Sequence, residues 1–411
     1  MTIQASTAFD EIDTRTSGER EAVAVAEERA IVVWRGDRLP YRVVPMRIAE
    51  ISGRAARNAL AAAHQEATEA INPLRERWYA ARVEAARDLG FDDLAALHDA
   101  SAAVRLDDQA VEAQRFLFES ETVYFAALRR YLALVDIELG DATEADLAHI
   151  LRGAGFAAWF DRRDLPRIVA RIAGDLGLTL PDGLALPDVG GSTAFSSALG
   201  NLGVALAADA AGTAADEESP MARAYGLLFE RLLLDDAWLE GRLGVPAEEV
   251  PVVADFLAFS ALYRLRHDAA LLLYGLRLHR GAAAPLARAY YSGMIGLLTG
   301  ATAPESDYLA QLGAGFHGAT SLRASNLAGG LRTWLEARHG AAWWREPAAG
   351  TSLRDLWSRR STWDAGDVVA HLGYNAVDWR PVLRQIRTQL IGEMSGYGGP
   401  NITTRAGTRK V

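Results

Sequence analysis

Helical periodicity over most of the chain is the feature that most limits how this sequence can fold. From Val44 onward apolar residues recur at spacings of three and four, for example in residues 193–210 and 252–280, and this spacing gathers them on one face of a helix. Near the start, residues 30–41 combine a β-branched run with a turn at residues 35–37 and predict one short hairpin. We therefore expect a mostly α protein with minimal strand content.

Helix boundaries are marked by Asn, Pro and Gly. Asn72–Pro73 predicts a break between helices over residues 47–71 and 74–89, because asparagine caps a helix and proline suits its first turn. Residues 179–192 are rich in proline and glycine and predict a loop. The loop leads into the apolar helix expected over residues 193–210.

Composition excludes several kinds of site and partner. The 411 residues include no cysteine, which rules out disulfides, cysteine nucleophiles and thiolate metal sites. A formal net charge of -10 disfavours a nucleic-acid partner, since phosphate binding needs a basic surface. The apolar runs fall short of the roughly 20 residues that span a bilayer, and the acidic start is unlike a signal peptide. We expect a cytoplasmic protein with no nucleic-acid or membrane partner.

Isolated polar residues give no complete site. No two histidines lie three or four residues apart with a carboxylate to complete a ligand set. Adjacent carboxylates at residues 216–218 and 235–236 could bind a hard cation, but such runs usually mark a solvated helix face or start. The tryptophans at residues 343, 344, 357 and 363 predict core packing near the C-terminal end.

Four segments of the second half follow an order found in one enzyme family. They are residues 225–239, which begin YGLLFERLLLD, residues 262–279, the pieces Tyr308–Leu309, Phe316–His317 and 322–324, and residues 340–357 with their paired tryptophans. With their surroundings, residues 72–386, they resemble the oligoendopeptidase and thimet-oligopeptidase-like zinc metallopeptidases. Their shorter carboxypeptidase-like bacterial relatives are the most similar.

The resemblance implies the bilobed helical fold of the oligopeptidases, with a cleft. It divides the chain into a disordered leader (1–20), an N-terminal helical lobe (21–178), a metallopeptidase-like helical lobe (179–391) and a flexible C-terminal tail (392–411). The leader and tail are polar and lack periodicity, which is typical of segments that do not pack.

The residues at the family's catalytic positions depart from its chemistry. That chemistry needs two histidines one helical turn apart, a glutamate beside the first as general base, and a carboxylate ligand from the next helix. In this chain the histidine positions fall on Ser197 and Asn201, the base on Ala198, and the third ligand near Arg223. The family's transition-state tyrosine falls near Ser321. The resemblance therefore implies a degenerate member with no zinc and no other cofactor.

We expect a pseudo-metallopeptidase that binds a peptide or protein partner in the former active-site cleft. The residues expected to contact the peptide are His317, Arg223, Asn201, Tyr308 and Arg323. The peptide could be a precursor that another enzyme modifies, or the chain's own tail presented to such an enzyme. Two alternatives stay open: an enzyme with zinc-independent chemistry in the same cleft, and an inactive structural partner of an active paralogous peptidase.

Overall fold

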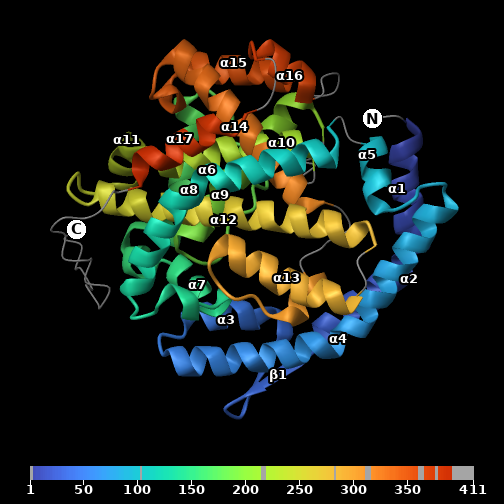
Figure 1. Ribbon diagram of the computed structural model, residues 1–411. Coiled ribbons are helices and arrows are strands. Elements are labelled where there is room, and N and C mark those ends of the chain that lie inside the picture. Colours follow the sequence, from blue (N-terminus) through green and yellow to red (C-terminus); the bar gives the residue numbers. More distant parts are fainter. Residues whose placement is uncertain are drawn as a thin grey trace. The chain divides into compact units, whose positions relative to one another are not determined.

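The chain is helical almost throughout (Figure 1). The computed structural model describes residues 3–101, 104–213, 219–281, 284–310, 316–359, 365–374 and 378–390. Within these ranges the one sheet has two strands, β1 (Ile31–Trp34) and β2 (Asp37–Pro40). The expected mostly α fold with minimal strand content is confirmed.

The chain divides into two compact units. The first unit comprises Met1–Glu121, Leu128–Leu151 and Leu265–Ala319, and the second comprises Thr122–Ala127, Arg152–Arg264 and Thr320–Val411. Three helices contribute residues to both units: α6 (Leu106–Ala133), α12 (Val250–His279) and α14 (His317–His339). This division differs from the expected boundary at residue 178, because residues 265–319 group with the N-terminal part of the chain.

The remaining helices of the first unit lie within residues 3–151 and 284–299. They are α1 (Ile3–Arg15), α2 (Ser17–Arg29), α3 (Val44–Glu50), α4 (Arg54–Asp88), α5 (Leu94–Ser101), α7 (Glu144–Leu151) and α13 (Ala284–Thr299). The expected disordered leader is wrong for residues 3–20, which form α1 and the start of α2. Ile12 is fully buried in a cluster with Ala86 and Leu97, so a few apolar side chains anchor a segment whose overall composition is polar.

Helix α4 runs without interruption through Pro73, so the predicted break at Asn72–Pro73 is wrong. Asn72 is fully buried, and its Nδ2 donates to the carbonyl oxygen of Ser306 at 2.9 Å. Its side chain therefore serves a tertiary contact instead of capping a new helix. The neighbouring Ile71 packs in a core cluster of the first unit, and this burial stabilises the helix against the lost hydrogen bond at proline.

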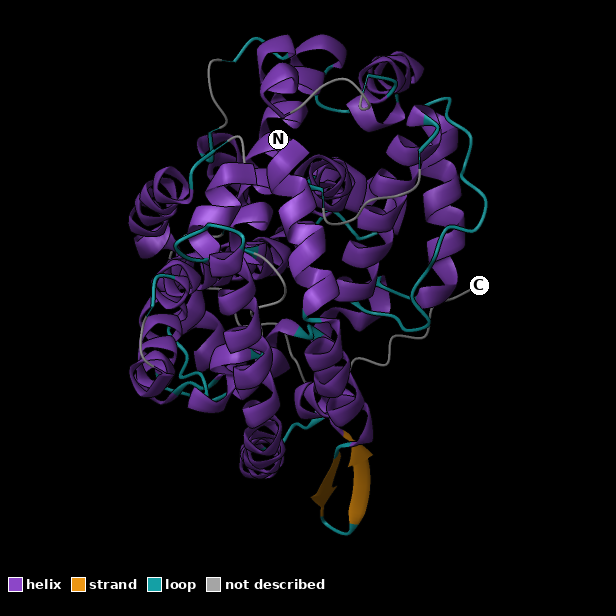
Figure 2. Cartoon of the chain, turned by 90° about the vertical axis from the view of Figure 1, so that its right-hand side faces the viewer, coloured by secondary structure: helices purple, strands orange, loops and turns teal. Residues whose placement is uncertain are grey.

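The predicted hairpin is confirmed, and Figure 2 shows its two strands projecting beyond the helices beside them. Arg35 (φ 53°) and Gly36 (φ 88°) both have positive φ, as a two-residue turn between antiparallel strands requires. Val32 of β1 is buried in the same core cluster as Leu60 of α4. One face of the hairpin thus packs on the first unit.

The remaining helices of the second unit include α9, which packs mainly against α8, α10 and α15. They are α8 (Leu165–Asp175), α9 (Ser192–Ala211), α10 (Pro220–Glu230), α11 (Asp236–Trp238), α15 (Pro347–Trp357), α16 (Ala365–His371) and α17 (Arg380–Gln389). Residues 179–191 form the predicted loop. Trp343, Trp344 and Trp357 are buried as predicted, while Trp363 lies outside the described residues, as do the acidic stretch at residues 216–218 and the tail from residue 392.

Helix α9 confirms the apolar helix expected over residues 193–210. It ends at Gly212, whose positive φ of 62° forms a left-handed C-cap. By length and composition α9 is the one helix among the described residues that could cross a membrane. A single helix of this kind is weak support for a membrane span, because buried core helices share the property, and most of α9 is packed against α8, α10 and α15.

Candidate functional site

Helices α9 and α10 pack at very short range through glycines. A methyl group added at Gly203 would collide with the carbonyl oxygen of Tyr225, and one at Gly226 would lie 3.0 Å from the carbonyl oxygen of Gly200. Only glycine lets the two backbones approach this closely. The positions matched to the zinc ligands therefore lie on a rigid pair of neighbouring helices.

The three positions of α9 that the resemblance matches to zinc ligands and the general base differ sharply in burial. Ser197 is exposed, Asn201 is half-buried with its Nδ2 donating to the carbonyl oxygen of Ala185 at 3.1 Å, and Ala198 is fully buried. A hydroxyl, a methyl and an amide do not fit zinc, which proteins bind through His, Cys or carboxylate. No group of three His, Asp or Glu that could hold a metal occurs in the described ranges.

Arg223 and Ser321 also lie in the second unit. Arg223 is half-buried on α10, and its Nε is buried without a hydrogen-bond partner among the described residues. Ser321, at the expected tyrosine position, is buried, and its Oγ likewise has no described partner. Arg323 is half-buried on the same helix, α14. A buried, unpaired guanidinium nitrogen favours binding of an oxygen acceptor.

A polar network beside Ser197 was missed from the sequence. Ser196 Oγ donates to Glu230 Oε1 at 2.5 Å, and Arg264 Nη2 meets the same carboxylate oxygen at 2.7 Å. Arg264 Nη1 also donates to Ser196 Oγ at 3.2 Å. No local signal in the sequence links these three residues, because they come from α9, α10 and α12. The network has no histidine to activate Ser196 as a nucleophile.

Arg231, the residue after Glu230, is buried, and no ion pair joins it to a carboxylate in the part of the chain that the structure describes. Its Nη1 donates to the carbonyl oxygen of Ser325 at 2.8 Å, and its Nη2 donates to Ser325 Oγ. Burial lowers the pKa of Arg231 to about 10, although the nearby Glu230 carboxylate acts in the opposite direction. At neutral pH Arg231 stays charged and adds a positive field to this part of the second unit.

The other two predicted peptide contacts lie in the first unit. Tyr308 is buried in an apolar cluster, and its hydroxyl donates to Glu76 Oε1 at 2.5 Å. The structure therefore does not support Tyr308 as a peptide contact, because its ring and hydroxyl are already engaged. His317 is the exposed first residue of α14.

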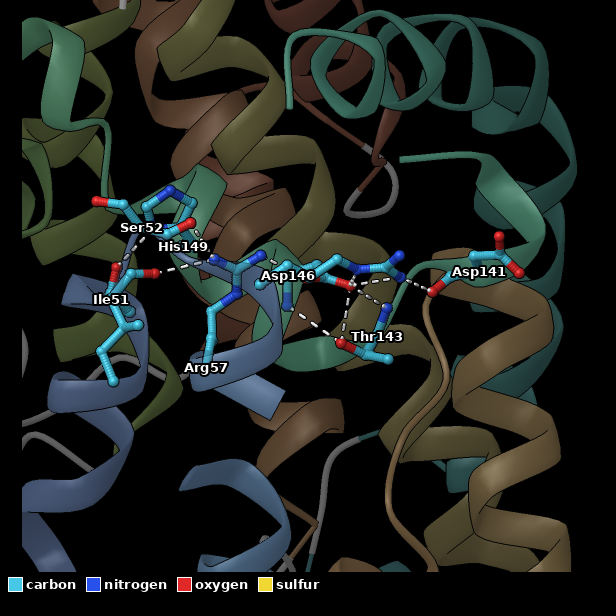
Figure 3. Close-up of polar contacts among 9 residues, drawn as sticks. Ile51, Ser52, Arg57, Asp141, Thr143, Asp146 and His149 are labelled. Atoms are coloured by element: carbon cyan, nitrogen blue, oxygen red, sulfur yellow. Dashed lines mark hydrogen bonds and ion pairs between the residues drawn. The ribbon is translucent and has the colours of Figure 1, made fainter. Parts of the chain in front are cut away.

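A dense polar network of the first unit centres on Asp146 (Figure 3). Its Oδ1 lies 2.6 Å from Arg57 Nη2, and both side chains are fully or almost fully buried. Its Oδ2 accepts from Thr143 Oγ1 at 3.0 Å and from Arg54 Nη2 at 3.3 Å. Burial alone would raise the pKa of Asp146, but these hydrogen bonds outweigh burial and hold the pKa below its usual value. The saturated donor set indicates a structural role.

A second acid of the first unit, Glu144, is half-buried and lies in a different electrostatic environment. Its Oε1 lies 3.9 Å from His267 Nε2. Burial, followed by repulsion from Asp307, raises the pKa of Glu144 to about 8. Burial also lowers the pKa of His267 to about 4. Both side chains are therefore mainly uncharged at neutral pH, which suits burial in the first unit.

Comparisons with known proteins support the architecture and little else. No model of a known protein family matches the sequence, and no curated protein matches it. Among solved structures, the chain is similar to a crystal structure described as an oligoendopeptidase F from Bacillus anthracis strain Ames, with a TM-score of 0.62. The match covers 94% of this chain and 77% of the other at 12% sequence identity. The chain therefore has an oligopeptidase-like, all-helical fold.

Proposed function

We propose that this protein is a pseudo-metallopeptidase that binds a peptide or protein partner at its former active site without hydrolysing it. The observation that carries the proposal is the set of side chains on α9, Ser197, buried Ala198 and Asn201, which the resemblance matches to the positions of two zinc ligands and the general base. A buried alanine methyl has no group that could activate water. The oligopeptidase-like fold supports a peptide as the ligand.

Arg223 supports a ligand that carries a carboxylate. Its unpaired, buried Nε and its place on α10 beside α9 suit a charge-assisted hydrogen bond to a peptide carboxylate. The neighbouring Arg264 is neutralised by Glu230, so it competes less strongly for the same anion. The peptide's terminal carboxylate would then occupy the place where the family's enzymes hold zinc.

Metal content and peptide cleavage test the loss of catalysis. We expect purified protein to hold well under one equivalent of zinc by mass spectrometry and to leave fluorogenic peptides intact. One equivalent of tightly held zinc, together with cleavage that a chelator abolishes, would reject the proposal.

Anisotropy with a labelled peptide tests carboxylate recognition. The probe is the chain's own C-terminal segment, residues 396–411, with either a free or an amidated terminus, added to a chain that ends at residue 395. We expect the free acid to bind about tenfold more tightly, the effect of one charge-assisted hydrogen bond. Arg223→Ala should abolish the difference, while Arg171→Ala, an exposed arginine on α8, should preserve it. A difference that survives Arg223→Ala would contradict this role.

A further inference from the structure

The β1–β2 hairpin carries an exposed face that does not pack on the first unit. The strand register pairs Ile31 with Pro40 and Val33 with Arg38, and directly opposite residues of antiparallel strands project to the same side. All four are exposed, including 60% of Val33. We call this set the hairpin face. Val32 lies between Ile31 and Val33 on the same strand, and its side chain points to the opposite side, into the core.

Positive charge surrounds the apolar centre of the hairpin face. Residues 29–42 contain four arginines and one carboxylate, a net charge of +3 in a chain whose total is -10. The four are all exposed: Arg29, Arg35, Arg38 and Arg42. Arg42 meets Glu27 at 3.4 Å, whereas no ion pair within the described ranges joins the other three to a carboxylate. The excess charge is therefore available to a partner.

The free edge of β2 is poorly suited to adding another strand. The hydrogen bond from Tyr41 N–H to the carbonyl oxygen of Ala30 fixes the alternation of the ladder, so the backbone groups of Arg38 and Pro40 point away from β1. Proline has no N–H to donate, and a charged arginine also discourages strand addition. A partner would contact the side chains of the face instead of extending the sheet.

The tip of the hairpin is unsuited to insertion into a bilayer. Arg35, Gly36 and Asp37 form the tip and are exposed, and charged groups are costly to bury in lipid. Trp34, the aromatic residue nearest the tip, is half-buried and packs against the core of the first unit. Ile31 and Val33 belong to β1 of the hairpin that Figure 2 shows projecting beyond the neighbouring helices, and both are exposed, so a protein partner can reach them.

We propose that the hairpin face docks an acidic, partly apolar segment of a protein partner. Ile31 and Val33 lie two residues apart on one strand, so they can contact apolar side chains spaced two apart on an extended segment. Arg35 and Arg38 at one end of the face, with Arg29 at the other, pair with carboxylates that flank those side chains. This surface is separate from the peptide site on α9 and α10 and does not depend on it.

A labelled peptide of alternating glutamate and leucine provides the probe, with a glutamine–leucine peptide of the same length as the neutral control. We expect the full chain to bind the acidic peptide in fluorescence anisotropy, with an affinity that falls as salt rises, and to bind the neutral peptide at least tenfold more weakly. Val33→Glu and Arg38→Glu should each weaken binding of the acidic peptide at least tenfold.

Two matched variants separate docking from general charge effects. Phe118→Glu adds the same charge at another exposed apolar residue of the first unit, and Arg77→Glu reverses another exposed arginine; both should leave binding within twofold. Circular dichroism checks that all variants are folded. The proposal is overturned if the wild type does not bind the acidic peptide or if the controls weaken binding equally. Cosedimentation with phosphatidylserine vesicles, lost in Val33→Glu, would also overturn it in favour of a lipid surface.

Discussion

Two acidic residues of the first unit, two positions apart in the sequence, lie in opposite electrostatic environments. Asp146 is held as a carboxylate by Arg57, Thr143 and Arg54, whereas Glu144 has a raised pKa. The local sequence could indicate only the Thr143 contact of Asp146, because its two arginine donors come from α4, about 90 residues earlier in the chain. The structure therefore predicts opposite effects of pH for the two side chains.

Replacement of Asp146 should be strongly destabilising. Asp146→Asn leaves the buried Arg57 without its counter-charge, and breaking a buried ion pair in this way costs about 3–5 kcal/mol of the free energy of unfolding. Because the folded pKa is depressed, the contribution of the carboxylate is present above its unfolded pKa of about 4 and is lost as pH falls through the lower folded value. Urea unfolding at several pH values measures both effects.

Asp141→Asn is the matched control for Asp146→Asn. Asp141 is exposed, and Arg54 binds its backbone carbonyl oxygen instead of its side chain (Figure 3). We expect a change within about 0.5 kcal/mol. If both variants lost the same free energy of unfolding, the Arg57–Asp146 ion pair would contribute no more to stability than the exposed Asp141 side chain.

Glu144→Gln should stabilise the protein at alkaline pH. The folded pKa of about 8 lies above the ordinary value of 4.5, so the wild type loses stability as pH rises between these values, while glutamine has no proton to lose. The gap between variant and wild type should widen from about pH 4.5, where the unfolded chain begins to lose this proton, and level off above about pH 8. Between about pH 7 and pH 9 His267 is largely neutral in both states, so Glu144 accounts for the change in that part of the range. The measurement is the melting temperature of both proteins across this pH range. If the two melting temperatures changed in parallel with pH, the raised pKa of Glu144 would be contradicted.

At the scale of single elements, the close pairing of α9 and α10 makes a prediction with an internal control. Gly203→Ala should destabilise the protein by about 1–3 kcal/mol, because the new methyl group forces the helices apart. Gly200→Ala, one turn earlier on α9, has no atom within 4 Å of the added methyl and should stabilise by about 0.5–1 kcal/mol through helix propensity. Guanidinium unfolding of both variants tests the pairing, and the same sign in both would refute it.

Local patterns predicted the elements whose structure depends on nearby residues. The hairpin followed from its β-branched run and glycine turn, and α9 followed from its apolar sequence between glycine-rich ends. Pro73 failed as a helix breaker because long-range burial of Asn72 overrode local propensity. Helix α10 ends at Glu230, and the next residue, Arg231, makes a buried contact with Ser325 that no local pattern indicates.

The site could be predicted only in part, for the same reason. The resemblance matched Ser197, Ala198 and Asn201 to catalytic positions, and this match stays a prediction, while the helix that carries them is confirmed. Their unequal burial, and the link from Ser196 to Glu230 and Arg264, depend on three helices meeting in space. Nothing in the local pattern around Arg264 indicates that its partners lie 34 and 68 residues away.

At the scale of the whole molecule, the division into units does not follow the sequence. Helices α6, α12 and α14 each supply residues to both units, and in α12 the division falls between Arg264 and Leu265. Helix formation is cooperative along its length, so loss of one part of such a helix weakens the other part. Contiguous lobes separated by a linker would lack this coupling.

Shared helices predict that the two units unfold together. Eight of the ten tryptophans lie in the second unit, all except Trp34 and Trp78, so fluorescence reports mainly on that unit, while far-ultraviolet circular dichroism reports on helices of both. In urea we expect the two signals to give one midpoint. Leu265→Pro removes a backbone hydrogen bond of α12 where the units divide and should separate the midpoints. Separate midpoints already in the wild type would show that the shared helices do not couple the units.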